Sequence, residues 1–231
     1  MCGRYTLYQT EELADRFEFN EDEFDEVRAD VRPRYNVAPE QVMPVITENE
    51  NRDRHLILMR WGFMPVWAKD ERDVFKYRTF NARAEGLFNK VTWKRAARTS
   101  RCLVPSNGFY EWRDRPDGKQ PYFIKPRQDK SFAFAGIYRN WRDKEGAEYG
   151  TYAIVTTDAN DQMSYVHNRM PVILKRNDEE HWLEPDNDDP AKLESLLVPY
   201  PEGQLDIRPV SRAVNTIRTD SEQLLTPIDS V

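Results

Sequence analysis

The sequence contains few of the residues on which many common chemistries depend. It has two cysteines and three histidines among 231 residues, and none of them falls at the short spacings typical of a metal site. Two cysteines also exclude a disulfide framework and favour a reducing compartment. The glycine-rich loops G-x-G-x-x-G and G-x-x-x-x-G-K-[ST] are absent, and so is the G-x-S-x-G nucleophile elbow. We therefore expect no metal and no cofactor.

Long apolar segments and targeting signals are missing as well. No apolar run approaches the length of a membrane span, and the N-terminus has no basic segment followed by an apolar one. We expect a protein without a membrane partner that works in the cytoplasm, or on the nucleoid within it.

The charge is distributed unevenly. The net charge of −6 by itself disfavours a nucleic-acid partner. Ten acids stand against two arginines in residues 11–30, whereas residues 60–115 carry thirteen Lys or Arg against six Asp or Glu. This pattern predicts a locally positive groove on an acidic protein. Arginine outnumbers lysine by 24 to 10. Guanidinium groups bind phosphate and stack on bases, although an arginine-rich, acidic composition can equally reflect a high-salt cytoplasm.

Strand patterns dominate the chain, and helices interrupt them irregularly. The sequence predicts a turn at 115–118 between two strands, and a helix that starts at Asp189-Pro190. We expect one α+β domain over residues 1–231, with a mostly antiparallel, barrel-like sheet and peripheral helices. Expected strands cover 42–47, 55–59, 103–104, 108–112, 122–125, 132–138 and 152–156, and other expected helices cover 10–19 and 90–100.

Cys2 directly follows the initiator methionine. Removal of Met1, which a small second residue permits, would leave an α-amine and a thiol on one residue. An α-amine titrates near pH 7.7 to 8, so a useful fraction is nucleophilic at neutral pH. Such an aminothiol condenses with an aldehyde to an imine and then closes to a five-membered thiazolidine. The alternative is that Cys2 is an ordinary residue near a frayed terminus.

Five stretches carry polar and aromatic residues in patterns unlike those of a core or a simple loop. Taken singly, each has an ordinary interpretation: a solvated strand face around Asn81, an exposed acid at Glu111, and a helix cap at His167. Together they supply the amide, carboxylate and imidazole that aldehyde condensation needs, because protons must move as the carbinolamine forms and dehydrates. Cys102 is best explained as a buried small hydrophobe. The stretches are residues 1–5, 34–39, 79–85, 105–112 and 167–171.

The ordered set of motifs resembles the SOS-response-associated peptidase (SRAP) family, whose members form covalent links to abasic sites in single-stranded DNA. The similarity runs along nearly the whole chain. An isolated match to one of these strings would be weak, but the series around an N-terminal cysteine is highly specific. The strings are MCGRY, RYNVAP, RWGFMPVW, FNARAE, CLVPSNGFYEW, HNRMPV and RPVSRAVN.

The resemblance implies a role for each matching residue. Cys2 would attack the ring-opened abasic sugar through its amine and close the thiazolidine through its thiol. Asn81 would hold Cys2 and the sugar by hydrogen bonds, while His167 would assist ring opening and Glu111 the imine chemistry and its reversal. The phosphate-binding cations would be Arg4, Arg83 and Arg169, and the residues lining the DNA channel would be Trp61, Pro39 and Met170.

Two rival functions stay open from the sequence. An N-terminal-nucleophile hydrolase, such as a glutamine amidotransferase, can also begin Met-Cys-Gly, although its downstream motifs are not apparent here. A non-covalent single-strand binder would make Cys2 incidental. The peptidase label of the family reflects self-processing that exposes the cysteine, and ordinary removal of Met1 would suffice in this chain. We expect a monomer whose partner is single-stranded DNA with abasic sites.

Overall fold

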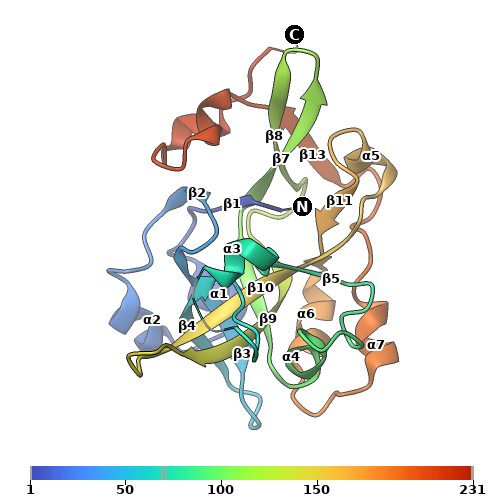
Figure 1. Ribbon diagram of the computed structural model, residues 1–231. Helices are drawn as coiled ribbons and strands as arrows, with labels where there is room; N and C mark the ends of the chain where they lie inside the picture. Colours follow the sequence, from blue (N-terminus) through green and yellow to red (C-terminus); the bar gives the residue numbers. More distant parts are fainter. Residues whose placement is uncertain (1, 69, 71, 230–231) are drawn as a thin grey trace.

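The computed structural model describes residues 2–68, 70 and 72–229, apart from the side chain of residue 75. Its larger sheet closes on itself, because each of five strands is hydrogen-bonded to the next around a ring (Figure 1). In ring order these strands are β3 (Val42–Glu48), β4 (Arg54–Trp61), β10 (Glu148–Asp158), β9 (Phe132–Arg142) and β6 (Arg101–Ser106).

Three short strands attach to the outside of this ring. β5 runs parallel to β10, whereas β11 and β12 run antiparallel to β10 and β9. Strand β10 therefore joins the barrel to both β5 and β11, and these two strands carry motifs singled out in the sequence. The three strands are β5 (Asn81–Arg83), β11 (Arg169–Pro171) and β12 (Ile173–Leu174).

A second, antiparallel sheet rises above the barrel (Figure 1). Its central hairpin pairs Arg115 with Gly118 across the tight turn, which confirms the predicted hairpin. Within this sheet, the N-terminal strand is hydrogen-bonded to the hairpin on one side and to the strand of the Arg34 motif on the other. The strands, in spatial order, are β13 (Leu205–Pro209), β8 (Gly118–Pro126), β7 (Gly108–Arg115), β1 (Arg4–Leu7) and β2 (Arg34–Val37).

Aromatic side chains fill the core between the two sheets. The Tyr5 ring from β1 packs edge-on against Trp61 of β4, with ring centroids 5.1 Å apart. The Tyr5 and Tyr152 hydroxyls are 2.8 Å apart, so each buried phenol has a hydrogen-bond partner. At Gly136 the strands approach so closely that a Cβ would lie 2.7 Å from the Cys102 sulfur. Cys102 is fully buried there, as expected.

The helices are short and lie around the sheets (Figure 1). Asp189 caps α7 by accepting a hydrogen bond from the Ala191 N–H, which confirms the predicted helix start. None of the helices in the described residues is long and apolar enough to cross a membrane. The α-helices are α1 (Leu13–Phe17), α2 (Glu21–Val27), α3 (Asp73–Tyr77), α4 (Lys94–Thr99), α5 (Asp161–Ser164), α6 (Arg176–Leu183) and α7 (Pro190–Ser195), and the 3-10 helices are η1 (Arg212–Asn215) and η2 (Glu222–Leu225).

The expected α+β architecture, with a mostly antiparallel barrel, is confirmed. Two details differ. The helix expected over 10–19 begins only at Leu13, because the Thr10 carbonyl first closes a turn with the Leu13 N–H. The barrel also contains a parallel pairing between β4 and β10, and β5 adds a second one. The sequence of a strand shows which of its side chains point to each face of the sheet. It does not show whether the adjacent strand runs parallel or antiparallel.

Candidate active site around the N-terminal strand

The structure brings Cys2 and Asn81 together. The Asn81 Nδ2 donates a hydrogen bond of 2.7 Å to the Cys2 carbonyl oxygen, and both residues are buried. Asn81 belongs to β5, whereas Cys2 lies two residues before the start of β1, so the bond joins the segments that lead into two different sheets. This hydrogen bond holds the backbone of Cys2, the residue whose nitrogen is expected to become the α-amine after removal of Met1.

Glu111 faces the Cys2 thiol from β7. Arg4 is paired with Tyr110 across β1 and β7, which places the next residue on β7 beside the N-terminal segment. Burial raises the pKa of the Cys2 thiol well above its usual range, and the negative charge of Glu111 raises it further. Both effects favour the protonated thiol over the thiolate.

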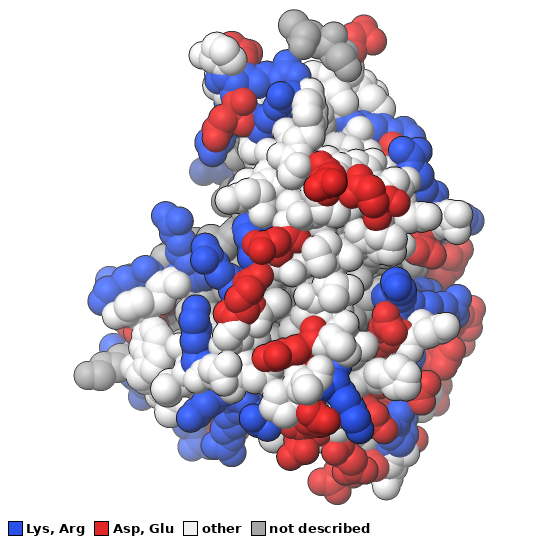
Figure 2. All heavy atoms as spheres, turned by 90° about the vertical axis from the view of Figure 1, so that its right-hand side faces the viewer, with Lys and Arg blue, Asp and Glu red and all other residues white. Residues whose placement is uncertain are grey.

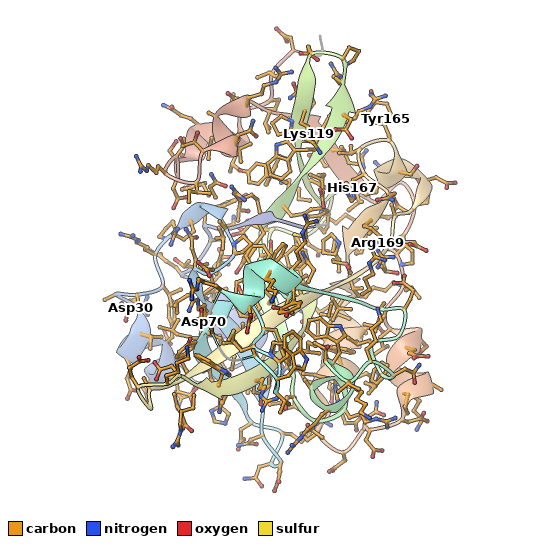
Figure 3. The ribbon with its side chains drawn as sticks, viewed as in Figure 1. Asp30, Asp70, Lys119, Tyr165, His167 and Arg169 are labelled. Carbon is orange, nitrogen blue, oxygen red and sulfur yellow. The ribbon has the colours of Figure 1, made fainter. Side chains whose placement is uncertain are left out.

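His167 lies just after α5 and is fixed by the chain that follows it. The backbone N–H of Arg169 donates a hydrogen bond of 3.0 Å to the His167 Nδ1. The same Nδ1 lies 3.1 Å from the Arg169 carbonyl oxygen, so the Arg169 backbone offers it both a donor and an acceptor. Figure 3 shows Lys119, His167 and Arg169 following one another down the same side of the molecule.

Two hollows meet at the N-terminal segment and form one groove. They share Gly3, Arg78 and Phe80, so the groove runs past the residue that follows Cys2, whereas Cys2 itself is buried and lines neither hollow. The part that contains the predicted proton-transfer groups has a volume of about 630 Å³. It is also lined by Arg83, Glu111, Trp112, Lys119, Asp158, His167, Asn168 and Arg169, and the other part by Arg4, Ala38, Pro39 and Ile217.

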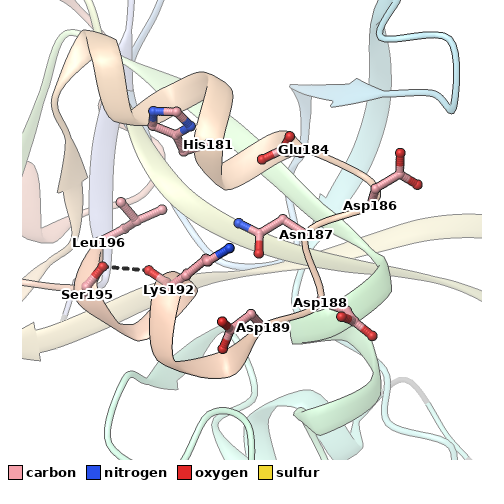
Figure 4. Close-up of a pocket in the computed structure, with 9 residues that line it drawn as sticks. All are labelled: His181, Glu184, Asp186, Asn187, Asp188, Asp189, Lys192, Ser195 and Leu196. Carbon is pink, nitrogen blue, oxygen red and sulfur yellow. Dashed lines mark hydrogen bonds between the residues drawn. The ribbon is translucent and has the colours of Figure 1, made fainter.

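The groove is basic, whereas other parts of the surface are acidic. Arg78, Arg83 and Lys119 face it, and Arg78 was not among the predicted DNA-binding residues. By contrast, the face that bears α5 to α7 gathers acidic side chains toward its lower edge (Figure 2). A hollow between α6 and α7 belongs to this acidic region, with Glu184, Asp186, Asp188 and Asp189 in its wall (Figure 4). Among the residues that the structure describes, no cluster could hold a metal ion.

Arg169 is committed to neighbouring groups in the protein and is not a freely available cation. Its side chain is 9 % exposed, and its two terminal nitrogens bind Glu85 with distances of 2.7 and 2.9 Å. It also contacts Asp158 at 2.5 Å and donates to the Thr156 carbonyl at 2.7 Å. The expectation of a phosphate contact is therefore replaced. Arg169 holds β10, β11 and the end of β5 together, and its backbone orients His167.

This reassignment makes a prediction about stability. Arg169→Met should lower the free energy of unfolding by about 2 kcal/mol, because it leaves the buried Thr156 carbonyl without its charged donor and removes the ion pair with the half-exposed Glu85. Arg83→Met removes the same charge from an exposed position of the groove. It should change stability by less than about 0.5 kcal/mol and weaken binding to single-stranded DNA. Denaturant unfolding and fluorescence anisotropy measure the two effects, and equal stability of both variants would contradict the assignment.

Trp61 and Met170 do not line the groove, and the expectation that they do is wrong. Both side chains are fully buried, and the Trp61 Nε1 donates to the Phe80 carbonyl at 2.8 Å. The exposed aromatics nearby are Trp67, at 41 %, and Tyr77, at 48 %. Their ring centroids lie 4.6 Å apart, and Tyr77 directly precedes Arg78.

A sequence signal could have separated the two tryptophans. Trp61 is the last residue of a strand and takes part in its alternation, whereas Trp67 follows a Gly62 with a φ of +150° and Pro65. Glycine and proline mark the end of the strand, so the second tryptophan of the string RWGFMPVW is the one free to lie at the surface.

Comparison with known proteins agrees with the motifs. The family model described as SOS response associated peptidase (SRAP) matches residues 1–217. An abasic site processing protein of Bacillus subtilis, YoqW, is 41 % identical over 228 residues, covering 97 % of this chain and 99 % of its own. The abasic site processing protein HMCES of Gallus gallus is 33 % identical over 86 % of this chain and 67 % of its own. A crystal structure of a Bacteroides thetaiotaomicron protein superposes with a TM-score of 0.87 at 28 % identity, covering 98 % of this chain and 100 % of that chain.

Proposed function

The chain belongs to the SRAP family, and from this premise we propose that it processes abasic sites in single-stranded DNA by forming a covalent thiazolidine cross-link through Cys2. The observation that carries this proposal is the hydrogen bond from Asn81 to the Cys2 carbonyl. It holds the buried Cys2 next to Gly3, which lines a basic groove together with Glu111 and His167. We further propose that residues 1–231 act as one domain, since one core cluster includes residues of both sheets, and that the protein works as a monomer.

The chemistry follows from the two groups of Cys2. Once Met1 is removed, the α-amine attacks C1 of the ring-opened sugar and gives a carbinolamine. Loss of water from the carbinolamine gives an imine. The thiol sulfur then adds to the imine carbon, its proton leaves, and the nitrogen gains a proton, which closes the thiazolidine. An imine that is not captured by the thiol would undergo β-elimination, which cleaves the DNA strand. Ring closure removes the imine and therefore makes the cross-link durable.

The neighbouring groups suit these proton transfers. The Cys2 thiol starts protonated because its pKa is raised by burial and by Glu111, so a base has to accept its proton as the carbon–sulfur bond forms. Glu111 is the carboxylate that faces this thiol and is proposed as that base. His167, whose ring is held by the Arg169 backbone, is proposed to assist opening of the sugar ring.

The groove favours a single strand as the occupant. Arg4, Arg78 and Arg83 supply positive charge for the backbone along its length. Trp67 and Tyr77 form an exposed aromatic step beside Arg78. Stacking on an aromatic side chain is worth about 1–3 kcal/mol per base, and it requires a base that is not paired in a duplex.

Intact mass spectrometry of the protein, before and after incubation with single-stranded DNA that contains an abasic site, tests this proposal. We expect the free protein to lack Met1. The product should have the mass of protein plus DNA minus one water. Undamaged DNA of the same sequence is the control. A protein that lacks Met1 but gains no DNA mass, and that hydrolyses glutamine instead, would favour the N-terminal-nucleophile hydrolase.

Glu111→Gln should slow both closure and reversal of the cross-link. The substitution keeps the shape of a buried side chain but removes its capacity to exchange a proton. General acid–base catalysis contributes typically about 10²- to 10⁴-fold, so we expect rates at least about tenfold lower. Rates come from denaturing gels over time, with release measured by chase with excess abasic DNA. Asp114→Asn, an exposed substitution on the same strand, is the matched control. Unchanged rates in both directions would make Glu111 a structural acid.

A further inference from the structure

A separate hollow of about 360 Å³ lies between α4, the end of β9 and the segment that follows β4. None of the described residues that line it also lines the groove around Cys2. Figure 1 shows α4 and β9 below α3, away from the β7–β8 hairpin. Its polar lining is Thr92, Arg95, Thr99, Ser100, Arg139 and Asn140, and its apolar lining includes Phe63, Val66 and Val91.

Arg95 and Arg139 place two positive charges in this hollow. The lining contains no acidic residue, and no described carboxylate in residues 2–68, 70 and 72–229 forms an ion pair with either guanidinium. Burial lowers the pKa of the Arg139 guanidinium, and the positive charge of Arg95 lowers it further. The two positively charged guanidinium groups repel each other, and an anion bound between them would relieve this repulsion. This arrangement stands out on a protein of net charge −6.

From these residues we infer that the hollow binds a phosphate group, supplied by the DNA backbone beyond the groove or by a free phosphate. Two guanidinium groups offer forked donors that match phosphate oxygens. The Asn140 amide and the Ser100 hydroxyl, which lies 3.4 Å from the Thr99 hydroxyl, also line the hollow, while the Thr99 hydroxyl donates to the Arg95 carbonyl at 3.1 Å. The apolar part beside them suits a sugar or base attached to the phosphate. The assignment to DNA rests on the proposed function.

One segment connects this hollow to the groove. The Phe63 N–H donates to the Thr79 carbonyl at 3.2 Å, and Thr79 lies between Arg78 and Phe80, which both line the groove. Farther along the segment, Val66 lines the hollow while Trp67 contacts Tyr77. A single strand that leaves the groove over this aromatic step therefore meets the hollow next. We expect it to bind a phosphate several nucleotides away from the abasic site.

The experiment measures binding of two undamaged single-stranded oligonucleotides as a function of salt. The short one fills only the groove, and the long one extends past it. The double variant Arg95→Gln, Arg139→Gln should flatten the slope of log K against log salt by about 0.7 for each phosphate that it no longer binds, and only for the long oligonucleotide. The double variant Lys90→Gln, Lys94→Gln removes the same charge from exposed positions that do not line the hollow, and it should leave the slope unchanged.

A second arm separates the two sources of phosphate. Inorganic phosphate is titrated into wild type and into the arginine variant at constant ionic strength, and binding is followed by NMR chemical shifts and by the melting temperature. Binding that disappears in the variant, with an unchanged DNA slope, would identify free phosphate as the ligand. An unchanged slope together with no phosphate binding to wild type would overturn the inference. Cross-link yield with a short abasic oligonucleotide is measured in parallel and should be unchanged in the variant, so failure of the proposed function shows itself separately.

Discussion

Cys2→Ala is expected to abolish the heat-stable adduct with abasic single-stranded DNA. Alanine is small enough for Met1 to be removed, so the α-amine remains and an imine still forms. Without the thiol, no ring closes and the imine hydrolyses or proceeds to strand cleavage. Denaturing gels after heating should therefore show no cross-link. Borohydride should trap the imine and restore a band, which shows that the amine acts first.

Two further variants test whether the loss of the adduct is due to the thiol of Cys2. Cys2→Ser offers a weaker nucleophile in the same place and should give at most a less stable adduct. Cys102→Ala removes the other thiol, which is fully buried against Gly136, and should leave the cross-link intact. A wild-type yield of heat-stable adduct from Cys2→Ala would show that the thiol has no part in the mechanism. If Cys2→Ala binds DNA as tightly as wild type and neither protein forms a covalent adduct, the protein is a non-covalent single-strand binder.

An uncleavable extension placed before Met1 is expected to have an equally large effect, although it changes no side chain. The Cys2 nitrogen then stays in a peptide bond and has no nucleophilic lone pair, so neither the imine nor the thiazolidine can form. The thiol, Asn81, Glu111 and His167 are all still present. Cross-linking should be abolished, as measured by intact mass after incubation with abasic DNA.

The matched control carries the same extension followed by a protease site that leaves Cys2 as the first residue. Cleavage should restore cross-linking to the level of the mature protein. A cross-link formed by the uncleaved protein would show that an internal lysine attacks the sugar. In that case the product should be reducible by borohydride, and the Cys2 amine would not be the nucleophile.

The local features of this protein were predictable from short stretches of sequence. The β7–β8 hairpin follows from the turn residues between Arg115 and Gly118, and the start of α7 follows from Asp189 followed by Pro190. Each depends on contacts a few residues apart, so no knowledge of the rest of the fold is needed. The aminothiol of Cys2 is likewise a property of its place in the chain, as is the family to which the ordered motifs belong.

The tertiary structure decided which side chains of those motifs are available to a ligand. Trp61 is buried in the barrel and Trp67 is exposed, although both lie in one string of eight residues. Arg169 pairs with Glu85, which lies 84 positions away, so its guanidinium is held in an ion pair that the sequence does not show.

Arg95 and Arg139, which form no ion pair with a carboxylate in the described part of the chain, lie together because α4 and the end of β9 meet at the same hollow. The sequence alone determined the order of the motifs and the local turns and caps, and it singled out Cys2 as the candidate nucleophile, because these depend on neighbours along the chain. Closure of the barrel decided burial and ion pairing, because both depend on residues that are distant in sequence and come together only when β10 pairs with β4, β5 and β11.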